Sequence, residues 1–252
     1  TLEAIWMIPF LVVFIEFLKG ILFTGFPWNL MGAALPPHLV ISQIADIIGV
    51  YGLSFIICFV NLFIFRFTGR YLKKEAPGIL REGIIVFLVL VSAYGYGLVR
   101  IAEIQQRVKA WKKIRVCVIQ PDIDQALKWT QPWVKKGLKR YLQMSDKASK
   151  GFHPDLMVWP ESAVTFYLNE EPGLTKEIRR SAAQNRFDLI LGATAYEKRG
   201  KKTIFHNCAF IFSKAGELID KYDKIHLVPF GEYIPLRKWL PFAKNIVGTE
   251  ED

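Results

Sequence analysis

The sequence has few of the residues that build disulfide scaffolds and zinc sites, with three cysteines and four histidines among 252 residues. Cys58, Cys117 and Cys208 are odd in number and include no CxxC spacing, which argues against a disulfide framework and a cysteine-ligated zinc ion. His206 and His226 lack a close ligand spacing such as HxxxH. We therefore expect no metal site, and we expect each cysteine to fill a core or lipid-facing position.

Charge is also scarce in the first part of the chain. Residues 1–99 contain six Lys or Arg against five acids, whereas the remainder contains 27 against 18. If the basic second part is tethered to a membrane, it most simply meets anionic lipid head groups. Nucleic acid is the rival partner, but neither a recognisable binding motif nor a basic–aromatic repeat supports it. We therefore expect no nucleic-acid partner.

The first part is instead rich in long apolar runs. Three of them approach the length that crosses a bilayer, namely residues 4–23, 50–67 and 83–99. Glu16 and Lys19 lie three positions apart on one face of the first run, where they can pair. Because ionisable residues in membrane helices usually face protein, this pair favours a bundle. The sequence predicts a membrane α-helical bundle of about three spans over residues 1–100.

The loops between these runs predict an orientation. The connection between the second and third runs carries five basic residues and is cytoplasmic by the positive-inside rule (Arg66, Arg70, Lys73, Lys74 and Arg81). The third run then leads outward and places residues 101–252 outside the cytoplasm, since long translocated domains largely escape this rule. The chain begins at Thr1 without an initiator Met and ends at Asp252 without a closing element, so we expect a fragment at both ends.

From residue 114 the pattern changes to alternating strand-like and helix-like segments, which are typical of a layered α/β domain. The expected strands are 114–120, 155–159, 189–193, 207–212 and 217–222, and the expected helices are 131–149 and 174–185. Sites in such folds form at the carboxyl ends of strands. Glu161 follows the second strand after a closing proline and is therefore a candidate for chemistry.

Two further charged residues lie in the irregular segment 222–235 (YDKIHLVPFGEYIP). Lys224 and Glu232 are separated there by apolar residues, a proline and a glycine. Charged side chains among apolar neighbours are costly unless they form pairs or take part in binding or catalysis. With Glu161 they fit a glycosidase with two acids, or an acyl-transfer site with a Glu base, a Lys oxyanion partner and a Cys nucleophile. The residues alone leave these alternatives open, together with an ordinary loop that carries two solvated charges.

Several segments resemble the nitrilase superfamily and occur in its order: Leu156–Val164 (LMVWPESAV), Leu191–Thr194 (LGAT) and Tyr222–Pro235. Within that superfamily the chain is most similar to the bacterial apolipoprotein N-acyltransferase family. The supporting segments are Thr24–Trp28 (TGFPW), Val50–Phe55 (VYGLSF) and Gln120–Trp129 (QPDIDQALKW). Each match is weak alone, but together they run from about residue 20 to 240.

The resemblance implies a partial nitrilase-like αββα sandwich over residues 101–252, truncated and set on the helical bundle. It places Glu161 on the general base, Lys224 on the lysine that stabilises the oxyanion, and Glu232 on a second glutamate that orients both. A lysine near two carboxylates stays protonated and can meet a developing negative oxygen. The resemblance also links three residues to substrate: Trp129, Asn207 and Pro235.

The reaction implied by the resemblance moves an acyl chain from a phospholipid to a cysteine thioester, and then to the N-terminal amino group of a diacylglyceryl-cysteine apolipoprotein. This is the last step of lipoprotein maturation and needs no cofactor. The resemblance implies a multi-pass protein of the bacterial inner membrane with a periplasmic catalytic domain, and we expect a monomer. A membrane-anchored amidase and a non-catalytic membrane protein are the alternatives.

One departure from the family pattern concerns the nucleophile. The family's catalytic cysteine follows a later strand, beyond the position of Asp252. None of the three cysteines of this chain matches that position. We therefore expect the polypeptide as given to form no thioester by itself.

Overall fold

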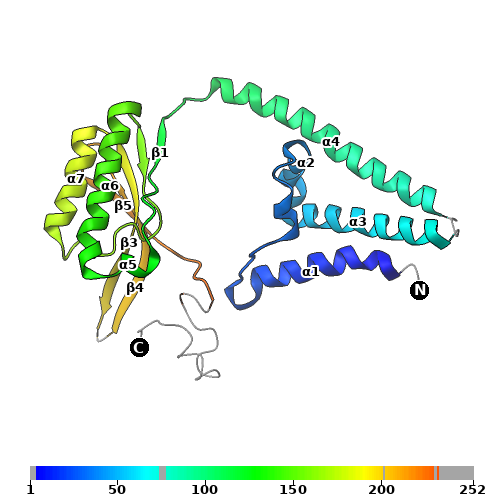
Figure 1. The fold of residues 1–252 in the computed structure, drawn as a ribbon, viewed down its shortest axis with the longest axis horizontal. Helices are drawn as coiled ribbons and strands as arrows, with labels where there is room; N and C mark the ends of the chain where they lie inside the picture. Colours follow the sequence, from blue (N-terminus) through cyan, green and yellow to red (C-terminus); the bar gives the residue numbers. More distant parts are fainter. Residues whose placement is uncertain (1–3, 74–77, 201, 230–231, 233–252) are drawn as a thin grey trace. The chain divides into compact units, whose positions relative to one another are not determined.

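A computed structural model describes residues 4–73, 78–200, 202–229 and 232 of the chain. The chain divides into two compact units, and each is described by itself (Figure 1). The first comprises Thr1–Trp111 with His226–Asp252, and the second comprises Lys112–Ile225.

The first unit is helical. Its long helices are α1 (Ile8–Ile21), α3 (Ala45–Lys73) and α4 (Ile79–Ala110). A 3-10 turn at Ala4–Met7 precedes α1, and 3-10 turns at Leu22–Thr24 and Met31–Ala34 with α2 at Leu39–Ser42 lie between α1 and α3. Figure 1 shows α1, α3 and α4 as separate long helices.

Two of the three expected spans are helices long and apolar enough to cross a membrane, Ala45–Gly69 of α3 and Ile79–Ala110. The first expected span, residues 4–23, falls short. Its α-helix α1 has 14 residues, fewer than the roughly 20 that a span requires. The described residues therefore contain two candidate spans and a shorter helix, and the expected bundle of about three spans stays a prediction.

Aromatic side chains pack α1 against α3 in opposite directions. Trp6 and Phe10, at the start of this segment, contact Phe59 and Phe55 in the middle of α3, whereas Phe17 near the end of α1 contacts Tyr51 closer to the start of α3. Such pairs stabilise beyond their buried area by about 0.5–1.5 kcal/mol each. The aromatic residues of the apolar runs thus join the helices of this unit.

Glu16 and Lys19 do not form the expected pair in the described residues. Glu16 Oε1 instead accepts a hydrogen bond of 2.7 Å from the Met31 backbone N–H, and Lys19 Nζ donates to the Trp28 carbonyl at 3.0 Å. Both charges bind the polar backbone of residues 28–31, a loop whose N–H and C=O groups require partners in an apolar setting. Glu16 is only 7% exposed, and its Oε2 has no hydrogen-bond partner in the described part of the chain.

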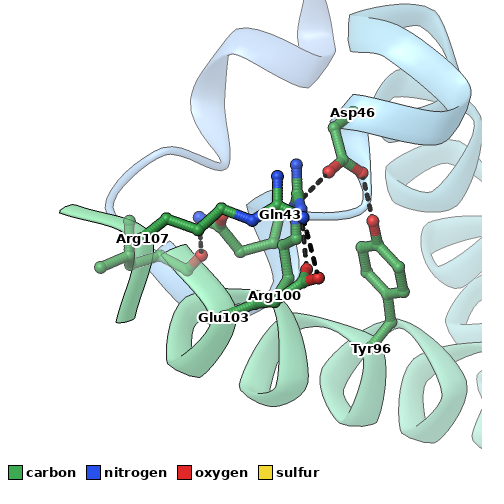
Figure 2. A network of polar contacts seen from close by, with 7 residues as sticks. Gln43, Asp46, Tyr96, Arg100, Glu103 and Arg107 are labelled. Atoms are coloured by element: carbon green, nitrogen blue, oxygen red, sulfur yellow. Dashed lines mark hydrogen bonds and ion pairs between the residues drawn. The ribbon is translucent and has the colours of Figure 1, made fainter. Parts of the chain in front are cut away.

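Ion pairs lie at both ends of the α3–α4 pair. Arg66 on α3 binds Glu82 on α4 through two nitrogens, at 2.7 and 3.0 Å, so this basic residue is paired and buried instead of solvated. At the other end, Arg100 Nε lies 2.7 Å from Asp46 Oδ2, and the Tyr96 hydroxyl donates to the other Asp46 oxygen (Figure 2). α3 is interrupted at Gly49, whose φ of 66° is not helical, but α4 is continuous. Along α4, Glu82 and Arg100 are separated by about 27 Å of helix, which is close to the thickness of a hydrocarbon core.

The second unit contains one mixed five-stranded sheet in the order β1-β2-β3-β4-β5. Its strands are β1 (Val116–Val118), β2 (Leu156–Val158), β3 (Asp188–Arg199), β4 (Lys202–Phe212) and β5 (Leu218–Asp223). The first three strands are parallel, while β4 and β5 are antiparallel to their neighbours. All five expected strands form, but β3 and β4 extend well past the expected segments into a long hairpin.

The helices of this unit, α5 (Gln125–Lys128), α6 (Gln131–Phe152) and α7 (Pro172–Asn185), include both expected helices. Figure 1 shows α6 and α7 side by side on one face of the sheet. Their buried residues Leu138, Tyr141 and Ile178 form one core with strand residues such as Met157 and Leu191. The expected α/β layering is confirmed as one helix layer on one mixed sheet. On the other face Val118 is 67% exposed.

Candidate active site

The first expected residue, Glu161, lies in a tight turn directly after β2. The Trp159 N–H continues the sheet by donating to Ile190 O at 2.8 Å, and the Ala163 N–H closes the turn on Pro160 O at 3.2 Å. Ser162 takes a φ of 49°, a left-handed conformation that few non-glycine residues adopt. The turn therefore presents Glu161 at the carboxyl end of a parallel strand, where α/β folds place their sites.

Gly192 on β3 lets this turn lie against the sheet. A Cβ on Gly192 would stand 2.6 Å from Glu161 Cα, 2.6 Å from Pro160 O and 2.7 Å from Ser162 N. All three are backbone atoms, so any side chain here requires the turn to move. The glycine of the LGAT segment is thus needed for close backbone approach.

Two residues from distant strands meet the Glu161 carboxylate. The Asn207 side-chain amide, from β4, donates a hydrogen bond to Glu161 Oε1. Lys224 Nζ, just past β5, lies 3.2 Å from the same oxygen, with the lysine side chain 29% and the glutamate side chain 63% exposed. The Lys224 N–H also donates to Asn207 O at 2.8 Å, so the β4–β5 pairing holds both donors beside each other.

Lys128 is a fourth residue at this site, and the sequence reasoning missed it. Its ammonium lies 3.4 Å from the Glu161 carbonyl oxygen, and its own carbonyl accepts a hydrogen bond from Thr165 Oγ1 at 3.3 Å. Burial lowers the pKa of Lys128, while the charge of Glu161 acts in the opposite direction. Its position beside Trp129 in the QPDIDQALKW segment is the signal that could have indicated it. Trp129 itself is 51% exposed.

Glu232 and Pro235 are the remaining expected site residues. Glu232 belongs to the first unit, where its Oε2 accepts from the Val228 N–H and its own N–H donates to Val228 O, both at 2.8 Å. Pro235 lies outside the described residues.

The three cysteines lie in a helix and two strands. Cys208 is buried on β4, and its thiol donates to Asp223 Oδ1 at 2.9 Å. Burial and this contact raise the pKa of the thiol to about 12, so it remains protonated and unreactive at neutral pH. Cys117 and Cys58 are partly buried, on β1 and α3. Across the described ranges, no group of three His, Cys, Asp or Glu side chains is placed to hold a metal ion.

The arrangement suits proton transfer beside a fixed positive charge. An exposed carboxylate held by an amide and an ammonium has the chemistry of a general base. An ammonium beside it has the chemistry that stabilises negative charge on an oxygen. The described cluster contains these groups and no nucleophilic side chain.

Sequence comparison defines the class of protein. Residues 115–245, about half of the chain, match the sequence model of the carbon-nitrogen hydrolase family, and the chain belongs to that family. Residues 2–63 match a second model, the apolipoprotein N-acyltransferase N-terminal domain. The resemblance predicted from the motifs is thereby confirmed, and the two matches fall on the helical first part and the α/β second part.

Individual relatives agree with the two models. The apolipoprotein N-acyltransferase of Geobacter metallireducens is 37% identical over 242 residues, which cover 95% of this chain and 45% of the relative. That of Rhizobium leguminosarum is 32% identical over 233 residues, with 89% and 42% covered. The chain thus spans less than half the length of the curated relatives it matches. Among solved structures, the carbon-nitrogen hydrolase of Helicobacter pylori is 23% identical, at a TM-score of 0.32 over 37% of this chain and 36% of that one.

Proposed function

We propose that the protein is an acyltransferase that moves a fatty acyl chain from a phospholipid to the N-terminal amino group of a diacylglyceryl-cysteine apolipoprotein. One observation supports this most directly: Glu161 is bound by the Asn207 amide and lies 3.2 Å from the Lys224 ammonium in a carbon-nitrogen hydrolase domain. The match of residues 2–63 to an acyltransferase domain supports the lipid substrate.

In the proposed mechanism Glu161 takes the proton of a cysteine thiol, which the family resemblance places beyond residue 252. The thiolate attacks the acyl ester carbon, and the Lys224 ammonium stabilises the oxyanion of the tetrahedral intermediate. Collapse breaks the ester bond, and the lysophospholipid oxygen leaves with the proton held by Glu161. The apolipoprotein amine then attacks the thioester carbon and gives a proton to Glu161; the carbon–sulfur bond breaks, and the departing thiolate takes that proton back from Glu161. Glu232 is proposed to orient the lysine and the base, and Trp129, Asn207 and Pro235 to contact substrate.

We further propose a multi-pass location in the bacterial inner membrane. The two ion pairs at Asp46–Arg100 and Arg66–Glu82 are separated by about 27 Å along α4, which is close to the thickness of the hydrocarbon core. The basic connection after α3 is assigned to the cytoplasm and the α/β unit to the periplasm. We also propose that a second sheet covers the exposed face of the described sheet in the complete protein, completing an αββα sandwich.

The experiment uses the complete protein that contains this chain. Incubation with a radiolabelled phospholipid should give an acylated enzyme that neutral hydroxylamine cleaves, as expected for a thioester. Glu161→Gln should abolish the adduct while the protein stays folded, because the amide cannot take the thiol proton. Glu177→Gln, an exposed change on α7, is the matched control and should acylate normally.

Three outcomes would contradict the proposal. An enzyme that hydrolyses small amides and forms no acyl adduct would be a membrane-anchored amidase. A protein without either activity would be a non-catalytic membrane protein. A normal thioester yield from Glu161→Gln would remove Glu161 from the role of base.

A further inference from the structure

A cleft runs along α7 in the second unit. It consists of a cavity of about 670 Å³ between α7 and the turn at residues 215–216, and a cavity of about 330 Å³ over β3, β4 and β5. Leu168, Asn169, Thr175 and Arg179 line both cavities, so the two are adjacent, and together they are here named the α7 cleft. Both volumes are of the order of the roughly 300–1,000 Å³ typical of small-molecule sites.

Side-chain hydrogen bonds fix the walls of this cleft. Arg179 Nε donates to Gly216 O at 2.7 Å, and Thr175 Oγ1 donates to Leu168 O at 2.7 Å. Gly216 has a φ of +77°, and a Cβ there would lie 2.4 Å from the Arg179 carbonyl oxygen, so this turn packs directly on the helix. The walls are therefore preformed, which reduces the ordering cost of binding.

The larger cavity forms a basic mouth. It is lined by Lys176, Arg179 and Arg180 from successive turns of α7. None of the described residues that line either cavity is acidic. In the described part of the chain, no hydrogen bond or ion pair engages the side chains of Lys176 and Arg180. Guanidinium and ammonium groups in this arrangement suit a phosphate or carboxylate, to which they form strong charge-assisted hydrogen bonds.

The smaller cavity has a mostly apolar lining and is here named the apolar chamber. Leu168, Phe210, Phe212 and Leu218 line it, together with polar side chains that include Asn169, Thr175 and Lys221. Thr175 and Lys221 already have partners, because Thr175 donates to Leu168 O and Lys221 pairs with Asp223. An aliphatic group suits the apolar part of this lining, because its transfer out of water is favourable.

The α7 cleft is distinct from the Glu161 cluster. Side chains alternate between the two faces of a strand. On β4, Cys208, Phe210 and Phe212 point to the helix face, so Asn207 points to the other face, where it binds Glu161. The proposed acyl-transfer chemistry therefore does not account for this cleft.

We propose that the α7 cleft binds a single-chain anionic amphiphile, with its tail in the apolar chamber and its phosphate or carboxylate at the basic mouth. A fatty acid and a lysophospholipid share this chemistry. The inference rests on the lining of the cleft and not on the acyl-transfer reaction.

The test uses the full chain in nanodiscs of phosphatidylcholine. Palmitate and lysophosphatidylglycerol that carry a diazirine in the tail are crosslinked by light, and the labelled peptides are identified by mass spectrometry. Label is expected on peptides that contain residues 168–183 or 210–221. Unlabelled palmitate and lysophosphatidylglycerol should compete, whereas inorganic phosphate and hexadecanol should each compete about tenfold more weakly, because each supplies only half of the interaction.

Charge-reversal variants test whether the basic mouth binds the anionic group of the ligand. Lys176→Glu with Arg180→Glu should reduce labelling about tenfold, and Lys147→Glu, an exposed reversal on α6, should leave it unchanged. Leu218→Asp addresses the chamber independently and should also reduce labelling, which keeps the test decisive if the double variant fails to fold. Labelling elsewhere, equal labelling of the reversal and control variants, or equally strong competition by phosphate alone would overturn the proposal. None of these readouts needs a thioester, so failure of the acyl-transfer proposal would leave them unaffected.

Discussion

Replacing Gly192 by alanine should displace the turn that carries Glu161. The added Cβ would stand 2.6 Å from Glu161 Cα and 2.6 Å from Pro160 O. Carbon atoms prefer separations of about 3.5–4.0 Å, so the turn must move by roughly 1 Å. Since the obstructing atoms are backbone, no rotamer change can relieve the contact, and overpacking of this kind costs about 1–3 kcal/mol.

The consequence should appear in two measurements. The Trp159 N–H donates to Ile190 O, and the Val164 N–H donates to Gly192 O at 3.1 Å, so both amides report whether the turn lies against β3. A local loss of 1–3 kcal/mol should accelerate their hydrogen exchange by roughly 5- to 150-fold. In the complete protein, a displacement of about 1 Å at a catalytic group should reduce acyl-enzyme formation by about 10²-fold.

Gly173→Ala on α7 is the control, because an added Cβ there meets nothing within 4 Å. It should leave the exchange of both amides and the acylation rate unchanged. If Gly192→Ala exchanges at the wild-type rate, the close approach of β3 to the turn is absent and the structural reasoning is refuted. Slow acylation with unchanged exchange would mean that Gly192 acts on the chemistry by another route.

Two further predictions concern buried groups in each unit. Glu16→Ala removes the buried acceptor of the Met31 N–H and should lower the free energy of unfolding in detergent by about 1–3 kcal/mol. Glu16→Gln keeps an oxygen and should cost less, and equal losses would show that the hydrogen bond is unimportant. Cys208 should resist iodoacetamide at pH 8, because its thiol pKa is raised to about 12. Since this folded pKa exceeds the unfolded value near 8.5, its stabilising contribution is complete below about pH 8.5 and is lost as the pH rises toward 12. Asp223→Asn should increase the alkylation rate, and rapid alkylation of the wild-type protein would contradict the assignment.

Much of the fold could be read from local patterns. The β-branched run around residues 116–118 and the apolar run at 156–158 predicted strands, and both form. The strand at residues 207–212 was also expected, but β4 begins at Lys202. Its first residues are polar or exposed and pair with Tyr196–Arg199 on β3. Cross-strand hydrogen bonds stabilise this extension, and a pattern based on hydrophobicity does not detect it.

In the helical unit, too, local patterns predicted the helices but not the partners of the charged side chains. Apolar length alone indicated α3 and α4, because a helix in lipid must be apolar for about 20 residues. Spacing alone also suggested that Glu16 would pair with Lys19. In the structure the backbone of residues 28–31 binds both, since unpaired backbone groups in an apolar setting are more costly than the separation of two side-chain charges. The partner of a buried charge depends on which loop folds over it.

For the candidate site, the sequence by itself determined the types of residue and one position. The strand followed by Trp-Pro-Glu places Glu161 at a strand end, and the segment around Lys224 marked a charge in apolar surroundings. Only the tertiary structure decided which groups meet. The β4–β5 register brings Asn207 beside Lys224, and the space left by Gly192 brings Glu161 to both. These contacts join residues up to 63 positions apart, and distances of that kind are set by strand pairing and close packing, which no local sequence pattern encodes.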